Sequence, residues 1–192
     1  MTTRLQHYYD PYPIADLDRH IAIIGFDTEE TRTVSYRVAG LLGVPALDCD
    51  RLLEHESGKS SWRLIWEEGE TRYRKLERAH LYRTLASRPF GVVSLGDGAL
   101  IHPGTRAKVA SFCHLVGLER DLASCYWHLR STERAEMDHW HPLHAGRLSS
   151  FEQLRPFFEA RRPGIEAAAE TISMVGSSPS AAAQQLFDGW RS

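Results

Sequence analysis

The 192-residue chain has few lysines, few cysteines and no long apolar run. Its only lysines are Lys59, Lys75 and Lys108, so any chemistry that needs a lysine must use one of these three. No apolar run approaches the ~20 residues of a membrane span, and the polar start does not read as a signal peptide. The motifs G-x-S-x-G, H-E-x-x-H and G-x-G-x-x-G are also missing, which leaves hydrolase, zinc-protease and dinucleotide-binding functions without support.

Charge and cysteine usage narrow the class of protein further. The chain has 23 basic and 25 acidic residues, a net charge of -2, and no basic block, which argues against affinity driven by nucleic-acid phosphates. Three widely spaced cysteines without a C-x-x-C pair, Cys49, Cys113 and Cys125, are typical of free thiols in a reducing cytoplasm. We therefore expect a cytoplasmic protein without a nucleic-acid or membrane partner.

The chain divides into a short arm and one domain. Residues 1–19, rich in tyrosine and proline, are interpreted as an extended aromatic arm that lies on the domain or on a protein partner, or as a partly ordered tail. Residues 20–192 have the composition of a single globular domain, with 42% hydrophobic and 25% charged residues in the chain as a whole. At this size a full core needs no disulfide or metal.

Strands alternate with helices along the domain. Short apolar runs predict strands at 21–24, 44–47, 91–95, 113–118 and 171–175. Helical spacing predicts helices up to about 42 and at 60–87, 103–111, 120–130, 151–169 and 179–190. This order predicts a three-layer α/β/α fold with a five-stranded parallel sheet. Ligands of such sheets bind beyond the carboxyl ends of the strands, here after Gly25 and at 48–50 and 96–98.

A specific motif follows the second predicted strand. Residues 47–77 read LDCDRLLEHESGKSSWRLIWEEGETRYRKLE. This string resembles the shikimate kinase family, which has an Asp-x-Asp, a following Arg and Glu, a Gly-[Lys/Met]-[Ser/Thr] turn and a Glu-Glu-Gly-Glu before an aromatic-Arg-x-x-Glu helix. The resemblance runs from about Ile21 to Gly189 and includes the glycine turn 96–98, His141-Pro142-Leu143 and Arg161-Arg162-Pro163. It implies a phosphate-loop kinase fold and, in the family, ATP-dependent phosphorylation of shikimate.

The resemblance implies that the substrate-binding half of the site is mostly present. Asp50 matches the aspartate that accepts hydrogen bonds from ring hydroxyls, and it is the catalytic candidate if the chain is active. Arg74 and Arg161 match the two arginines that clamp the substrate carboxylate, a role that suits planar guanidinium groups. The family's glycine triplet reads Gly96, Asp97 and Gly98 here, and Asp97 is the departure. The alternative is that Asp50 and Arg74 form a structural ion pair.

The nucleotide half departs from the family. A phosphate loop reads G-x-x-x-x-G-K-[ST], whose Lys neutralises phosphates and whose hydroxyl holds magnesium. The chain keeps the first glycine, Gly25, but has Glu30, Thr31 and Arg32 where the second glycine, the lysine and the hydroxyl belong. Thr33 offers a hydroxyl one position late. We therefore expect no cofactor, with ATP and magnesium required only if the chain is an active kinase.

Two further positions that hold nucleotide-binding arginines in the family have other residues here. Asp48 could still help to bind a magnesium ion. His128 stands at the position of the family's adenine-side arginine, and His141 at the position of the lid arginine. The segment 131–148 is the expected lid. Its cluster Asp138, His139, His141 and His144 gives a weak alternative, a metal site at His139, His141 and His144, although the spacing fits no regular metal motif. Protonation of these histidines near neutral pH is the other alternative.

Three functional hypotheses follow. The favoured one is a pseudokinase that binds shikimate or a related cyclic hydroxy acid without ATP-dependent phosphorylation. The second is an active shikimate kinase with an aberrant phosphate loop. The third is a scaffold in which the aromatic arm and an arginine-rich surface contact another protein.

Overall fold

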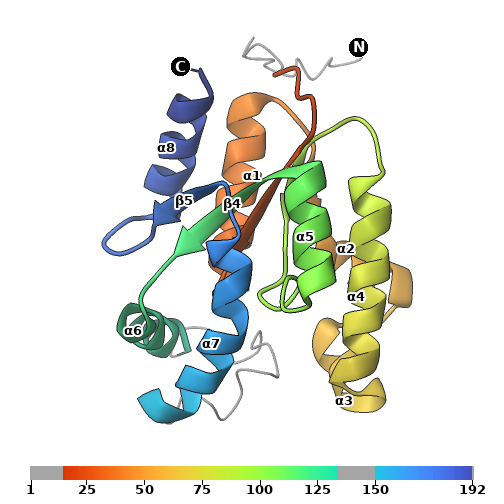
Figure 1. Cartoon of the computed structure of the whole chain (residues 1–192), viewed down its shortest axis with the longest axis vertical. Helices are drawn as coiled ribbons and strands as arrows, with labels where there is room; N and C mark the ends of the chain where they lie inside the picture. Colours follow the sequence, from red (N-terminus) through yellow and green to blue (C-terminus); the bar gives the residue numbers. More distant parts are fainter. Residues whose placement is uncertain (1–14, 134–149, 192) are drawn as a thin grey trace, which may run out of the picture.

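The computed structural model describes residues 15–133 and 150–191, and these residues form the predicted three-layer α/β/α fold (Figure 1). The central sheet has the strand order β2-β3-β1-β4-β5, and every strand pair is parallel. The strands are β1 (His20–Gly25), β2 (Ala46–Asp48), β3 (Val92–Ser94), β4 (Cys113–Glu119) and β5 (Glu170–Ser173). In the middle of the sheet, Ile23 of β1 pairs with Ser94 on one side and Val116 on the other.

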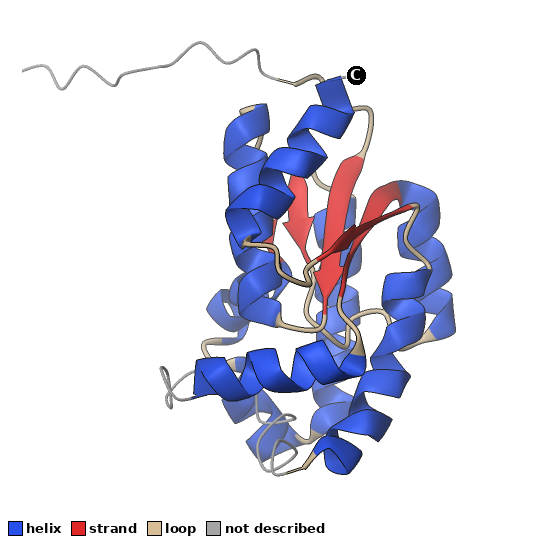
Figure 2. Ribbon diagram, turned by 90° about the vertical axis from the view of Figure 1, so that its left-hand side faces the viewer, coloured by secondary structure: helices blue, strands red, loops and turns tan. Residues whose placement is uncertain are grey.

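Helices cover both faces of this sheet (Figure 2). They are α1 (Thr28–Leu42), α2 (Cys49–Ser57), α3 (Ser61–Glu68), α4 (Glu70–Leu85), α5 (Pro103–Phe112), α6 (Leu122–Glu133), α7 (Phe151–Glu166) and α8 (Pro179–Arg191). Within the described ranges, no helix is long and apolar enough to cross a membrane.

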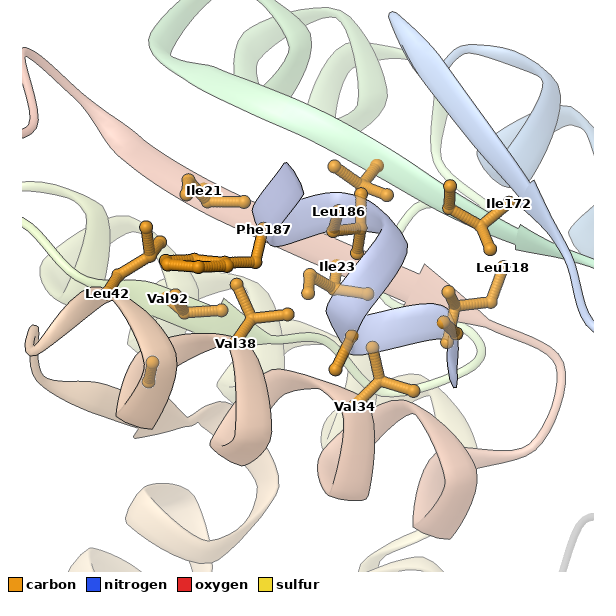
Figure 3. Close-up of a cluster of buried hydrophobic side chains, with 14 of the residues drawn as sticks. Ile21, Ile23, Val34, Val38, Leu42, Val92, Leu118, Ile172, Leu186 and Phe187 are labelled. Atoms are coloured by element: carbon orange, nitrogen blue, oxygen red, sulfur yellow. The ribbon is translucent and has the colours of Figure 1, made fainter. Parts of the chain in front are cut away.

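The alternation of side chains along β1 explains the two main cores. Ile21 and Ile23 point to the face covered by α1 and α8, where they pack with residues such as Val38 and Phe187 (Figure 3). The intervening residue Ala22 belongs to the opposite core, under α4, α5 and α7. A strand in a parallel sheet is buried on both faces, which explains why the residues of β1 form a continuous apolar run in the sequence. The sheet is therefore a rigid base, and its carboxyl edge is where loops carry polar side chains.

Two helical segments differ from the sequence-based prediction. The helix predicted at 60–87 is two helices, α3 and α4, separated by Gly69, whose φ of 81° lies in a region that favours glycine. The helix α2 was not predicted, because its nine residues are too short for a clear periodicity. Its N-cap is Asp48, whose side chain accepts a hydrogen bond from the backbone N–H of Arg51. The last residue of β2 thus also starts α2.

Part of the predicted organisation lies outside the described residues. The aromatic arm is described only from Ala15, whose N–H donates to the carbonyl of Leu42 at 2.9 Å, so this end of the arm lies on the domain. Most of the predicted lid, with His139, His141 and His144, also lies outside, and the described ranges contain no metal-ligating cluster. All three cysteines are free, as predicted, and all three are buried.

Candidate functional site

Two clusters of charged side chains lie at the carboxyl edge of the sheet. We call one the arginine cluster, made of Asp50, Arg74, Glu77, Asp97 and Arg161. We call the other the α1 cluster, made of Asp27, Glu30, Arg32, Asp48, Arg120 and His128. The first contains the residues that the sequence predicts for substrate binding, and the second surrounds the predicted nucleotide loop.

Four separate elements bring the arginine cluster together. Asp50 lies in the first turn of α2, Arg74 on α4 and Arg161 on α7, while Asp97 sits in the turn after β3. The fold brings these residues and the turn 96–98 together: Asp97 lies between Arg161 and Arg74, and Gly96 packs against Asp50. Asp50, Asp97 and Arg161 are almost completely buried.

Asp97 lies between the two arginines. The Nε atom of Arg161 donates to Asp97 Oδ2 at 2.6 Å, and its Nη1 donates to the carbonyl of Phe157 at 3.2 Å. Arg74 Nη2 lies 3.9 Å from Asp97 Oδ1, and Arg74 Nη1 donates to both carboxylate oxygens of Glu77 at 2.9 Å. Arg161 is therefore paired with Asp97, and Arg74 is paired with Glu77 and also has Glu70 Oε1 at 3.5 Å from its Nε.

The turn 96–98 packs tightly against these side chains. A Cβ atom on Gly98 would lie 2.2 Å from Arg74 Nη2, and one on Gly96 would lie 2.9 Å from Asp50 Oδ1. Contacts this short exclude any side chain at either position unless Arg74 or Asp50 moves. The absence of a side chain at these two positions lets the backbone pack directly against Arg74 and Asp50.

Three buried guanidinium nitrogens of the cluster have no hydrogen-bond partner among the described residues: Arg74 Nε, Arg74 Nη2 and Arg161 Nη2. Buried donors are nearly always paired, and leaving one unpaired costs about 1–3 kcal/mol, more for a charged group. Unpaired donors on two neighbouring arginines are what a ligand with oxygen acceptors would satisfy. The chemistry of these donors suits the oxygen acceptors of a small molecule.

Asp50 is held in its neutral form near pH 7. Burial raises its pKa to about 8, and the nearby carboxylates of Glu77, Asp48 and Asp97 add to the effect. The Tyr73 hydroxyl donates to Asp50 Oδ1 at 3.3 Å. A protonated carboxyl both donates and accepts, so Asp50 can pair with a ligand hydroxyl in either direction.

The α1 cluster begins where the predicted nucleotide loop should be. Only Phe26 and Asp27 separate the end of β1 from the start of α1 at Thr28, and Glu30, Thr31, Arg32 and Thr33 are all helical. Asp27 is the N-cap, and its Oδ1 accepts from the backbone N–H groups of Glu29 at 2.9 Å and Glu30 at 3.1 Å. The donors at a helix start that can bind a phosphate are thus occupied by a carboxylate of the chain.

Ion pairs hold the other charges of the α1 cluster. Arg120 donates to Glu30 through Nε and Nη2, His128 Nε2 lies 2.8 Å from Asp27 Oδ2, and Arg32 donates to Asp48. A cavity of about 10 Å³ lies between Glu30, Arg120 and His128, enough for roughly one water molecule.

The residues of the α1 cluster do not fit ATP with magnesium. Glu30 and Asp27 place carboxylates where phosphates would bind, and Thr31 is buried with its Oγ1 only 2.6 Å from a Cβ built on Gly25. Asp48, the candidate magnesium ligand, is bound to Arg32 and caps α2. We therefore derive no reaction step through a nucleotide at the α1 cluster.

Sequence reasoning gave no structural role to three important residues. Asp27 is a standard N-cap type directly before a helix, Arg120 directly follows the end of β4, and Glu77 stands three residues after Arg74 on one helix. Each position carried a signal, but the ion-pair partners of Asp27 and Arg120 come from distant parts of the chain and could not be assigned from spacing.

Comparison with known proteins agrees with this fold. A family model described as shikimate kinase matches residues 32–190. The chain is 33% identical over 165 residues to a shikimate kinase from Thermobifida fusca, a match that covers 85% of this chain and 90% of that protein. It is 31% identical over 166 residues to a shikimate kinase from Salinibacter ruber, a match that covers 85% of this chain and 78% of that one.

Solved structures show the same architecture. A shikimate kinase from Acinetobacter baumannii in complex with shikimate superposes with a TM-score of 0.75 at 22% identity, covering 92% of this chain and 94% of the other. A shikimate kinase from Bacteroides thetaiotaomicron gives a TM-score of 0.74 at 21% identity, covering 91% and 99%. These likenesses confirm the predicted fold.

Proposed function

Because the chain belongs to the shikimate kinase family, we propose that it binds shikimate or a related cyclic hydroxy acid at the arginine cluster without phosphorylating it from ATP. The observation that carries this proposal is the start of α1. Only two residues separate it from β1, and the carboxylate of Asp27 occupies the backbone donors at its first turn. In this proposal the chain keeps the substrate-binding half of the family's site at the arginine cluster and has lost the nucleotide-binding half at the start of α1.

The arginine cluster supports the binding half of the proposal. Asp50 offers a carboxyl group for ring hydroxyls, and Arg74 and Arg161 carry buried donors without hydrogen-bond partners in the described part of the chain. Charge-assisted hydrogen bonds from such donors contribute about 1.5–3 kcal/mol each. One relative of the same fold is a complex with shikimate, which supports a ligand of this class.

The relatives favour a second candidate, an active shikimate kinase. Relatives that are 31–33% identical over 85% of the chain are shikimate kinases. For this chain to act in that way, the first turn of α1 would have to unwind, and Asp27 and Glu30 would have to leave His128 and Arg120. Phosphorylation of shikimate by the purified protein with ATP and magnesium would establish this second candidate.

Calorimetry tests ligand binding. Shikimate, quinate and dehydroshikimate are titrated into the wild type, Asp50→Ala and Arg74→Lys. We expect millimolar or tighter binding of at least one compound to the wild type and at least tenfold weaker binding to Arg74→Lys, because an ammonium group cannot place donors where Nε and Nη2 lie. The matched control is Arg72→Lys, an exposed arginine on the same helix, which should bind like the wild type.

If neither these acids nor their neutral methyl esters bind the wild type at millimolar concentration, or if the variants bind equally well, the binding proposal is wrong. A scaffold that contacts another protein then becomes the better hypothesis, and a protein partner should be sought directly.

A further inference from the structure

The buried carboxylate of Asp97 has no counterpart in the glycine triplet that the turn 96–98 resembles. Its side chain is 1% exposed and bonds Arg161 Nε at 2.6 Å, while Arg74 Nη2 lies 3.9 Å from its other oxygen. It thus contacts the same two guanidinium groups that a ligand carboxylate would use. The chain supplies from its own turn the anion that these arginines require.

The charges of the arginine cluster are therefore balanced before any ligand arrives. Among the described residues, Arg74 and Arg161 carry two positive charges, and the buried Glu77 and Asp97 carry two negative charges. The more exposed carboxylate of Glu70 also lies 3.5 Å from Arg74 Nε. A ligand carboxylate would add a further negative charge to a buried site whose two positive charges are already offset. The free-energy cost of removing that carboxylate from water would then not be balanced by an ion pair. It would also lie close to Asp97, and the two anions would repel each other.

The donors that remain unpaired among the described residues fit a different kind of group. Arg74 Nε and Nη2 and Arg161 Nη2 can bond oxygen acceptors that carry no charge, such as an ester carbonyl, an amide carbonyl or a hydroxyl oxygen. A neutral acceptor satisfies these buried donors and leaves the balance of charges unchanged.

We propose that Asp97 determines ligand specificity and makes this chain prefer a neutral, shikimate-like polyhydroxy ring over the corresponding acid. This inference rests on the proposed function, because it assumes that a ring of this class binds at the arginine cluster. Asp97 acts as an internal carboxylate that competes with the carboxylate of an acidic ligand.

The first test needs no variant. Shikimate and methyl shikimate have the same ring and hydroxyl groups, and only the ester lacks the negative charge. Calorimetric titration of the wild-type chain should give an affinity for methyl shikimate equal to or higher than that for shikimate. An affinity for shikimate at least tenfold higher than that for the ester would overturn the inference.

The second test removes the internal carboxylate. In Asp97→Gly and Asp97→Asn, the ratio of shikimate affinity to methyl shikimate affinity should rise at least tenfold, because the ligand carboxylate then takes the place of Asp97 beside Arg161. The control Asp16→Asn changes an exposed carboxylate and should leave the ratio unchanged. A ratio that stays the same in both Asp97 variants would overturn the inference.

The outcomes separate this inference from the proposal on which it rests. If the wild type binds shikimate well and the ester poorly, ligand binding stands and the role of Asp97 is wrong. If neither compound binds the wild type or a folded Asp97 variant, both proposals are wrong.

Discussion

The α1 cluster and the arginine cluster lie at the same edge of the sheet and are built from similar types of residue, but their hydrogen bonding differs. In the α1 cluster the charges form three direct pairs, Asp27 with His128, Glu30 with Arg120 and Arg32 with Asp48. In the arginine cluster three guanidinium nitrogens are buried without a hydrogen-bond partner within residues 15–133 and 150–191. The comparison shows that internal ion pairs engage the charges of the α1 cluster, whereas the arginine cluster keeps buried donors without a hydrogen-bond partner in the described part of the chain.

The largest effect is expected from breaking the pair at the centre of the arginine cluster. Arg161→Met leaves the carboxylate of Asp97 buried without its main partner, which should lower the free energy of unfolding by about 3–5 kcal/mol. The double variant Arg161→Met with Asp97→Asn should recover much of this loss, since the buried charge of Asp97 is then removed as well. Urea unfolding measures both.

The neighbouring Arg162 provides the control for this experiment. Its side chain is 52% exposed, so Arg162→Met should change the free energy of unfolding by less than about 0.5 kcal/mol. Equal losses in Arg161→Met and Arg162→Met would show that the buried pair does not hold the arginine cluster together.

The next effect concerns pH. Burial raises the pKa of Asp50 in the folded chain to about 8, against an ordinary value of 3.8, so the folded state binds the extra proton between these values. The contribution of Asp50 to the free energy of unfolding is therefore complete at low pH. It is lost as the pH rises towards 8, by at most about 1.4 kcal/mol per pH unit. Asp50→Asn cannot ionise and should remove this contribution.

Urea unfolding at pH 5, 6.5 and 8 compares the wild type with Asp50→Asn. We expect the wild type to lose stability relative to the variant as the pH rises. Parallel pH profiles for the two proteins would mean that Asp50 is ionised in the folded chain, and the description of the arginine cluster would have to change.

The smallest effect concerns the start of α1. Asp27→Ala removes the N-cap and should lower the free energy of unfolding by about 1 kcal/mol, whereas Asp27→Asn keeps a capping oxygen and should cost less. Thermal or urea unfolding of the two variants measures the difference. If neither variant loses stability, the cap does not fix the position at which α1 begins.

The sequence predicted the layers of the fold because its strands are apolar on both faces. Runs such as 21–24 and 113–118 stand out from the helices between them. It did not predict α2 or the break at Gly69. Short helices carry little periodicity. The break at Gly69 comes from its positive φ of 81°, which the helical spacing of apolar residues across 60–87 does not indicate.

The arginine cluster was largely predictable and the α1 cluster was not. Asp50, Arg74 and Arg161 lie in motifs that carry the family resemblance, and the fold brings them together. The pairs Glu30 with Arg120 and Asp27 with His128 join residues 90 and 101 positions apart, so no spacing rule could connect them. The role of Asp97 required the structure, because its distances to Arg74 and Arg161 decide it.

The most direct test of the central claim is phosphate transfer itself. The purified chain is incubated with shikimate, ATP and magnesium, and the formation of a phosphate ester is followed by phosphorus NMR, with the Thermobifida fusca shikimate kinase as the positive control. We predict no ester above the no-protein background and no binding of ATP with magnesium at micromolar concentration by calorimetry. Formation of the ester, or micromolar ATP affinity, would contradict the claim that the α1 cluster has closed the nucleotide side of the site.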